Sequence, residues 1–246
     1  MVVGPEGAGG PGPAAGPAGA GEPVPPGHRL LAPVQSQEVW AAGVTYQRSR
    51  EAREAESEEG MDLYARVYGA SRPELFFKSP GWRVRGPDEP IRVRADSAWN
   101  VPEPELGVVL DASLTPVAYV IGNDVSSRSI EGENALYLPQ AKIYEGACAI
   151  GPALVPVGAV APPLEIQLQI MREDRPLFEG ETSTGFMRRS IGELVAYLGR
   201  ELSFPHGCVL LTGTGVVPPD EVTLRPGDLV RIHIGGLGVL ANPVVP

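Results

Sequence analysis

Two short apolar segments rich in β-branched residues, 106–110 and 117–121, lie on either side of a polar turn at 111–116. Segments of this length joined by Asp, Ser and Pro residues are typical of a β-hairpin. With a four-residue loop at 112–115, Asp111 would face Pro116. The same register would place Glu105 opposite Gly122 and Glu103 opposite Asp124.

Further short segments with alternating polar and apolar residues predict that most of the chain is β-structure. Helical spacing predicts two helices: a charged, solvent-facing one at 48–59, and one at 191–202 that begins with a capping box of Ser190 and Glu193. The fold class is therefore α+β and predominantly β, as a mixed, rolled or barrel-like architecture. The additional predicted strands are 39–46, 74–78, 82–85, 91–94, 164–171, 229–234 and 239–240.

Two segments break this pattern. Residues 1–28 consist mainly of Gly, Pro and Ala, and we expect them to form a disordered tail, because they contain almost nothing to bury. Residues 126–140 are polar and show neither a helical nor a strand period. A structureless connection of this length is usually functional, so we interpret it as a lid or substrate-contact loop. A small N-terminal segment at 29–70 and a catalytic β-roll domain at 71–246 complete the predicted organisation.

Composition narrows the possible partners. The 246 residues carry a formal net charge of −10, which argues against nucleic acid or an anionic membrane as the main partner. Cys148 and Cys208 have neither metal nor redox spacing and read as reduced core residues of a cytoplasmic protein. No apolar segment reaches the length of a membrane span, and the N-terminus lacks the pattern of a signal peptide.

The predicted hairpin has a chemical consequence. Glu103 and Glu105 are two residues apart and share one strand face, and the register places Asp124 beside them. Three carboxylates this close repel one another unless a cation lies among them. Oxygen ligands suit Mg²⁺, Ca²⁺ or Mn²⁺ better than zinc or copper. The alternative is that the three are solvated residues on an exposed strand face.

Several motifs resemble the fumarylacetoacetate hydrolase family: PEPELGVVLD, YVIGNDVSSRS, LPQAKIY, LLTGTG and LRPGDLVRIHIGGLGVLANPV. The resemblance covers roughly residues 39–246. It implies a mixed β-roll in which Glu103, Glu105 and Asp124 hold Mg²⁺ or a similar ion. It also implies a homodimer or homotetramer and a small anionic 2-oxo acid as substrate.

One departure from the family pattern limits the reaction. Hydrolases of the family carry a His three residues after the Tyr of an Asn-Tyr motif, and a Glu three residues further on. Here Tyr46 follows Thr45, and Ser49 and Ala52 occupy those two positions. This pair activates water in the hydrolases, so its absence counts against carbon–carbon bond hydrolysis.

The segments RPELFFK, VPEPELGVVLD and NDVSSRSIEGENALYLPQAKIY are most similar to the branch that dehydrates 2-dehydro-3-deoxy-D-arabinonate to 2-oxoglutarate semialdehyde. This resemblance implies that Lys142 and Glu74 are the catalytic acid and base, in either order. Lys142 could instead orient the substrate carboxylate as an ammonium, or be a surface lysine in an ordinary salt bridge. Glu74 and Lys78 could equally lie on a surface strand. The candidates for substrate contact are Lys78, Arg83, Arg128, Gln140 and Thr214.

Two other functions remain open from the sequence. The first is a hydrolase, decarboxylase or isomerase of the same family that acts on acylpyruvates or oxo-diacids. The second is a non-catalytic binding protein with a structural ion, for which replacing Lys142 would change nothing measurable.

Overall fold

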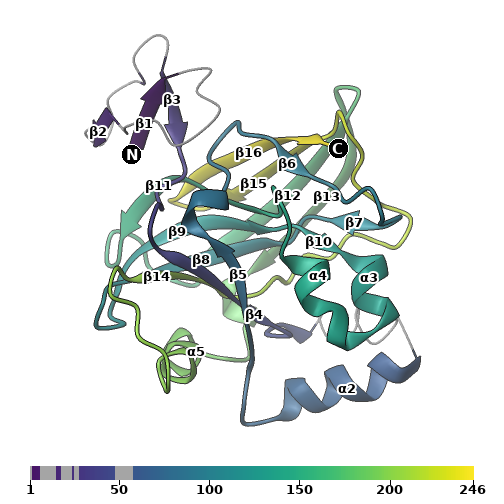
Figure 1. Ribbon diagram of the computed structural model, residues 1–246, viewed down its shortest axis with the longest axis horizontal. Coiled ribbons are helices and arrows are strands. Elements are labelled where there is room, and N and C mark those ends of the chain that lie inside the picture. The colour runs from purple at the N-terminus through teal and green to yellow at the C-terminus, as the bar shows by residue number, and fades with distance from the viewer. Residues whose placement is uncertain (1, 6–14, 18–23, 25–27, 48–57) are drawn as a thin grey trace.

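The computed structural model describes residues 2–5, 15–17, 24, 28–47 and 58–246 (Figure 1). Its largest sheet has six strands in the order β11-β9-β8-β14-β4-β5. The central β14 is antiparallel to β8 and parallel to β4. The strands of this sheet are β4 (Glu38–Gly43), β5 (Glu74–Pro80), β8 (Pro104–Leu110), β9 (Pro116–Asp124), β11 (Cys148–Pro156) and β14 (Cys208–Leu211).

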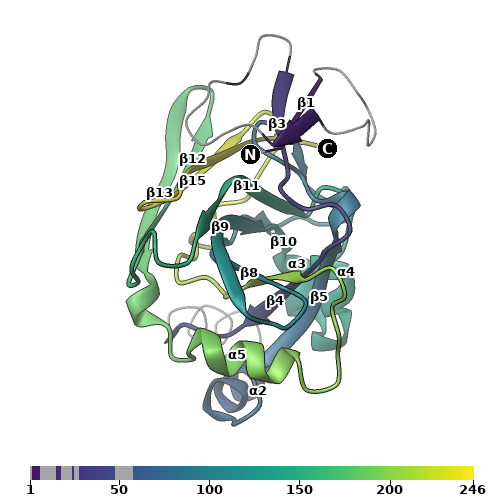
Figure 2. The same cartoon turned by 90° about the vertical axis from the view of Figure 1, so that its left-hand side faces the viewer.

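A second sheet has five strands in the order β13-β12-β15-β16-β6 and lies beside the first in both views (Figures 1 and 2). Its strands are β6 (Ile91–Arg92), β12 (Glu165–Arg172), β13 (Arg175–Ser183), β15 (Leu229–Ile234) and β16 (Gly238–Val245). The predicted predominantly β, mixed α+β class is confirmed.

The core lies between these sheets. Leu106 and Ile121 from the first sheet and Ile166 and Ile232 from the second belong to one cluster of fully buried side chains. Along β12, buried residues alternate with more exposed ones, as expected for a strand with one face in the core. Burial of an aliphatic side chain of this size contributes roughly 1.5–3 kcal/mol.

The six-stranded sheet is not a closed barrel, which corrects the barrel-like part of the prediction. β5 and β11 are its two edge strands. The chain beyond β5 bends back to β11 at a single residue, where Arg85 N donates to Cys148 O (2.9 Å) and Ile150 N donates to Arg85 O (2.9 Å). This contact curls the sheet and brings its two edges close together.

The β8–β9 hairpin has the predicted register but a different turn. Glu105 pairs with Gly122, and Asp124 N donates to Glu103 O at 3.0 Å. The predicted pairing of Asp111 with Pro116 is wrong, because Leu110 pairs with Pro116 and a one-residue irregularity restores the register. The Asp111 carboxylate caps the turn by accepting hydrogen bonds from the backbone amides of residues 113 and 115.

The segment 126–140 is structured, so the expectation of an irregular loop is wrong. The strands β7 (Asn100–Val101) and β10 (Ser126–Ser127) pair. Two short helices follow, α3 (Arg128–Glu133) and α4 (Leu138–Lys142), separated by the 3₁₀ turn η2 (Ala135–Tyr137). This compact unit closes one end of the curled sheet.

The two predicted longer helices fare differently. α5 (Ile191–Leu198) begins with the predicted capping box, in which Ser190 Oγ accepts a hydrogen bond from Glu193 N at 3.1 Å, but it ends four residues early. Residues 48–57 of the other predicted helix lie outside the described part of the chain, and α2 (Glu58–Gly69) continues from it. Residues 81–83 form the 3₁₀ turn η1 (Gly81–Arg83) where a strand was predicted. A third 3₁₀ turn is η3 (Thr184–Phe186).

Most of the predicted N-terminal tail also lies outside the described residues. Those that are described form a small sheet of β1 (Val2–Pro5), β2 (Ala15–Pro17) and β3 (His28–Leu31). β4, from the predicted 29–70 segment, lies inside the six-stranded sheet. No helix among the described residues is long and apolar enough to span a membrane.

Candidate metal centre and active site

Three carboxylates meet at one end of the β8–β9 hairpin. Candidate ligand oxygens of Glu103, Glu105 and Asp124 all lie within 4.8 Å of one another, and these residues are 3%, 1% and 1% exposed. The predicted convergence is confirmed, and the alternative of an exposed strand face is wrong. The cause is local: Glu103 and Glu105 project from the same side of one strand, and Asp124 ends its hairpin partner.

Lys142 enters this cluster from the end of α4. Its Nζ lies 2.8 Å from Glu103 Oε2 and 3.1 Å from Asp124 Oδ2, and it donates to Ser126 Oγ at 2.6 Å. The side chain is fully buried, so the alternative of a surface salt bridge is wrong. Lys142 therefore contacts two of the three candidate metal ligands directly.

Lys78 reaches the same carboxylates from the opposite edge of the sheet. The β4–β5 register shifts between the pairs Val39–Ser79 and Trp40–Phe77, which leaves Lys78 as the extra residue of a β-bulge. Bulges redirect a side chain and are common next to active sites. Lys78 is buried, forms an ion pair with Asp124, and donates to backbone carbonyls at 3.0 and 2.5 Å. The surface-strand alternative is wrong for this residue.

Arg128 completes the ring of cations. It is 1% exposed, and its Nη2 donates to Glu103 Oε1 at 2.8 Å. Its Nε lies 3.9 Å from Glu131 Oε2, another buried carboxylate on α3. Three cationic side chains thus face four carboxylates, which leaves one formal negative charge in a buried site.

That excess charge falls mainly on Glu105. Burial raises the pKa of the Glu105 carboxyl well above its ordinary value; the charges of Asp124 and Glu103 raise it further, and Lys142 opposes them. Gly213 N donates to Glu105 Oε2 at 2.6 Å from a backbone with φ +91°, a region that favours glycine. A divalent cation would satisfy this site, because its donors are all oxygens and its charge is negative. The residues present therefore fit Mg²⁺, Mn²⁺ or Ca²⁺.

Two tyrosines near the cluster were not predicted as site residues. The hydroxyl groups of Tyr46 and Tyr144 are buried, and within the described structure they have no hydrogen-bond partner. Burial raises the pKa of both phenols, and the next cause is Glu105 for Tyr46 and Asp124 for Tyr144. Both hydroxyl groups are therefore available to a bound substrate. A tyrosine in an apolar segment carries no sequence signal that distinguishes this role from core packing.

Glu74 stands at the start of β5, opposite Gly43 on β4. Its carboxylate occupies the space that the missing side chain of Gly43 leaves, since a Cβ added to Gly43 would overlap Glu74 Oε2. Oε2 itself is buried. The close approach of strand and side chain fixes where this carboxylate lies.

The other candidates for substrate contact are distributed unevenly. Thr214 is 3% exposed and follows Gly213, and its hydroxyl donates to Val216 O at 3.2 Å. Arg83 contacts Glu145 (3.8 Å) and the ring of Trp82. Gln140 is exposed on α4. Ser49 and Ala52, at the positions of the hydrolases' His and Glu, lie outside the described residues, and the described carboxylate cluster contains no histidine.

A sequence model of the fumarylacetoacetate hydrolase C-terminal family matches residues 38–245. The chain belongs to this family. A probable 2-keto-3-deoxyxylonate dehydratase of Haloferax volcanii is 50% identical over 214 residues, 86% of this chain and 73% of the relative. A 2-dehydro-3-deoxy-D-arabinonate dehydratase of Saccharolobus solfataricus is 45% identical over 221 residues, 88% of this chain and 74% of the relative.

The solved structures agree with these relatives. A 2-keto-3-deoxy-D-arabinonate dehydratase complexed with magnesium and 2,5-dioxopentanoate superposes with a TM-score of 0.83 at 42% identity, and the match covers 89% of this chain and 76% of that one. A family isomerase of Mycobacterium smegmatis, which acts on 5-carboxymethyl-2-hydroxymuconate, is more distant, with a TM-score of 0.68 at 28% identity over 89% of this chain and 82% of that one.

Proposed function

We propose that this chain is a magnesium-dependent hydro-lyase that removes water from a 2-keto-3-deoxypentonate and yields 2,5-dioxopentanoate, the semialdehyde of 2-oxoglutarate. The observation that carries the proposal is the buried triad Glu103, Glu105 and Asp124 with Lys142 among its oxygens. The dehydratase relatives at 45–50% identity support the choice of reaction within the family.

The names of the two dehydratase relatives describe one compound in the D-series. D-Arabinonate and D-xylonate differ only at C2 and C3, and both of these stereocentres are lost when C2 becomes a ketone and C3 a methylene. The C4 hydroxyl has the same configuration in both. We therefore propose a single natural substrate, D-2-keto-3-deoxypentonate, with its C1 carboxylate and C2 carbonyl directed toward the metal triad.

A bound Mg²⁺ would act as a Lewis acid on the C2 carbonyl and make the C3 protons more acidic. The chain's own residues would carry out the proton transfers. Lys142 and Glu74 are proposed as base and acid, one taking the C3 proton and the other protonating the C4 hydroxyl as it leaves. Lys78 holds Asp124 in place, and Arg128 holds Glu103. Arg128, Thr214, Lys78, Arg83 and Gln140 are the proposed substrate contacts.

The product requires a second proton transfer. Loss of water across C3 and C4 gives a C3=C4 enone that still carries a C5 alcohol. Removal of a C5 proton and return of a proton to C3 give the C4=C5 enol, which tautomerises to the C5 aldehyde. No external water enters this sequence, so it does not need the water-activating pair of the hydrolases. The buried hydroxyl groups of Tyr46 and Tyr144 are suited to donate hydrogen bonds to the substrate oxygens.

The test is a comparison of substrates with and without metal. We expect release of 2,5-dioxopentanoate from D-2-keto-3-deoxypentonate in Mg²⁺, loss of this activity in EDTA, and little or no pyruvate from an acylpyruvate or oxaloacetate. Glu103→Gln should abolish the activity, while Glu165→Gln on the exposed side of β12 should retain it. Pyruvate release as the faster reaction would instead support the hydrolase or decarboxylase alternative. We further propose a homo-oligomeric, cytoplasmic enzyme of pentose breakdown.

A further inference from the structure

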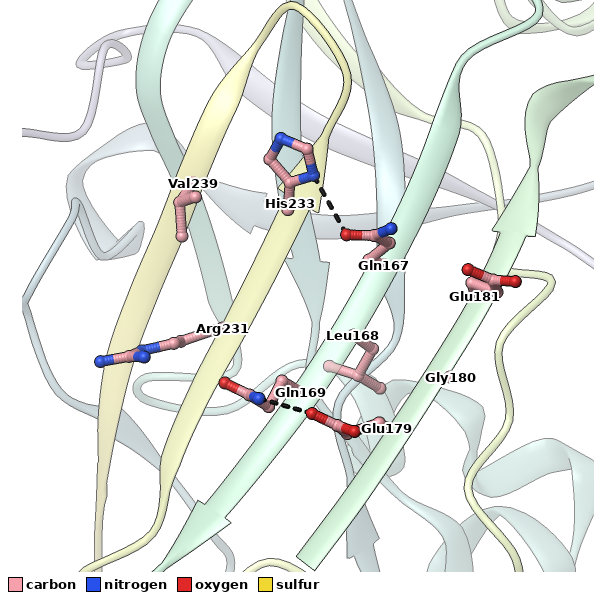
Figure 3. Close-up of a pocket in the computed structure, with 9 residues that line it drawn as sticks. All are labelled: Gln167, Leu168, Gln169, Glu179, Gly180, Glu181, Arg231, His233 and Val239. Carbon is pink, nitrogen blue, oxygen red and sulfur yellow. Dashed lines mark hydrogen bonds between the residues drawn. The ribbon is translucent and has the colours of Figure 1, made fainter. Parts of the chain in front are cut away.

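The five-stranded sheet has one face in the core and one face exposed. The exposed face is hollowed, with a cavity of about 500 Å³, and side chains from β12, β13, β15 and β16 surround it (Figure 3). None of these side chains belongs to the metal centre. We call this surface the outer face and define it by Gln167, Gln169, Glu179, Glu181, Arg231, His233 and Val239.

The charges on the outer face lie in separate stripes. β15 contributes Arg231 and His233, and β13 contributes Glu179 and Glu181, all of them exposed. β12 runs between these strands and contributes two neutral glutamines, as Figure 3 shows. The face therefore has a basic side and an acidic side with a neutral strand in the middle.

The strand register aligns these stripes level by level. Gln169 pairs with Arg231 on one side and with Glu179 on the other. In the same way, Gln167 pairs with His233 and with Glu181. Each level therefore consists of a basic residue, a glutamine and a glutamate in one row across three strands.

A twofold axis that runs along β12 in the plane of the face would superimpose opposite charges. Rotation by 180° about this axis exchanges the two stripes and leaves the levels unchanged. Arg231 would then face Glu179 of a second copy, and His233 would face Glu181 of a second copy. Four such contacts form at once, because every pair occurs twice in a twofold, self-complementary interface.

We propose that the outer face is a self-association surface that binds a second copy of this chain about a twofold axis along β12. The glutamines suit positions on that axis, because an amide both donates and accepts hydrogen bonds and can pair with the same residue of a second copy. Val239, 47% exposed beside the hollow, would add apolar area. Two packed sheets with strands nearly aligned are a common arrangement.

Charge complementarity is needed here because the chain as a whole carries −10, so two copies repel each other at long range. Matched pairs at the contact overcome this repulsion and fix the orientation. A small anionic ligand would be a poor occupant, since Glu179 and Glu181 line half of the hollow. This inference does not depend on the reaction that the metal centre catalyses.

The test uses two charge variants that cannot associate with themselves. R231E/H233E makes both stripes acidic, and E179R/E181R makes both stripes basic. We expect each variant alone to sediment at half the mass of the wild-type assembly in low salt, whose protomers are 26.0 kDa. An equimolar mixture of the two should regain the wild-type mass, because each stripe then meets its opposite. Analytical ultracentrifugation of the full-length chain provides the measurement.

The matched control is E201R/E221R, which makes the same charge change at two exposed sites outside the outer face and should keep the wild-type mass. Circular dichroism melts establish that each variant is folded. A monomeric wild-type chain would overturn the proposal, as would variants that keep the wild-type mass. Folded variants that dissociate singly but fail to reassemble when mixed would also overturn it.

Discussion

The ammonium of Lys142 lies between two carboxylates, 2.8 Å from Glu103 Oε2 and 3.1 Å from Asp124 Oδ2. At this distance it balances their charge and stays close to any proton acceptor bound over the triad. Replacement by methionine would remove both functions and keep most of the volume. We expect K142M to lower kcat by roughly 100-fold or more, in the range of general acid–base contributions.

The same variant should bind Mg²⁺ at least as tightly as the wild type, because the competing positive charge is gone. Isothermal calorimetry measures this affinity separately from kcat. K142R is the matched control: it keeps the charge but cannot give up a proton near neutral pH, so its kcat should also be low. A K142M enzyme with near wild-type kcat would exclude Lys142 from the proton transfers.

Glu105 makes the metal-free protein sensitive to pH. Its pKa in the folded state is raised above the ordinary value of 4.5, so folding binds a proton between the unfolded and folded pKa values. The resulting destabilisation is fully present above the folded pKa and disappears as the pH falls through that window. In EDTA at neutral pH, we therefore expect E105Q to be more stable than the wild type. The difference should close near pH 4.5.

Urea denaturation of both proteins across a pH series measures this difference. Mg²⁺ should reverse the order at neutral pH, because it stabilises only the chain that keeps its ligand. If the wild type were more stable than E105Q in EDTA at every pH, Glu105 would carry no burial cost and the electrostatic account of the site would be wrong.

At the scale of elements, the pairing of β4 with β5 positions Glu74. Gly43 faces Glu74 across these strands, and an added methyl group would meet only the mobile end of that side chain. We expect G43A to displace the carboxylate and to lower kcat by about tenfold or more if Glu74 transfers a proton, while the thermal midpoint changes little. G192A is the control, because a Cβ there meets nothing within 4 Å. Unchanged kcat in a folded G43A would count against Glu74.

The β-bulge at Lys78 shows how an element carries a catalytic constraint. In a regular strand, alternation alone decides which way each side chain points. The extra residue in β5 directs Lys78 to Asp124 across the curled sheet. Strand alternation predicted the β5 strand and its neighbours correctly, but it could not predict the bulge, which depends on how β4 and β5 pair.

At the scale of the whole molecule, the buried negative charge couples metal binding to stability. An ion bound only by the folded state adds about 2.7 kcal/mol at 100 times its Kd, and 1 kcal/mol corresponds to roughly 2–4 °C for chains of this size. We expect saturating Mg²⁺ to raise the thermal midpoint by about 5–10 °C over EDTA, and to leave an E103Q/D124N variant unchanged. Differential scanning calorimetry measures both; an equal rise in the variant would place the stabilising ion elsewhere.

The part of the site that lies on one hairpin was predictable. Strand alternation and the β8–β9 register place Glu103, Glu105 and Asp124 together, and the structure keeps this register although the turn differs. The family resemblance extended the prediction to Lys142, Lys78 and Arg128. The hydroxyl groups of Tyr46 and Tyr144 were missed, because they reach the cluster through tertiary contacts that leave no periodic signal in the sequence.

The sequence by itself determined the strands, the hairpin register and the oxygen ligands, because these follow from a two-residue period and from short-range pairing. Only the tertiary structure decided which charges surround the ligands. Lys78 and Lys142 come from opposite sides of a curled sheet and a short helix, and they meet Asp124 because residue 85 joins the sheet edges. The charge stripes of the outer face likewise depend on the order in which β13, β12 and β15 pair.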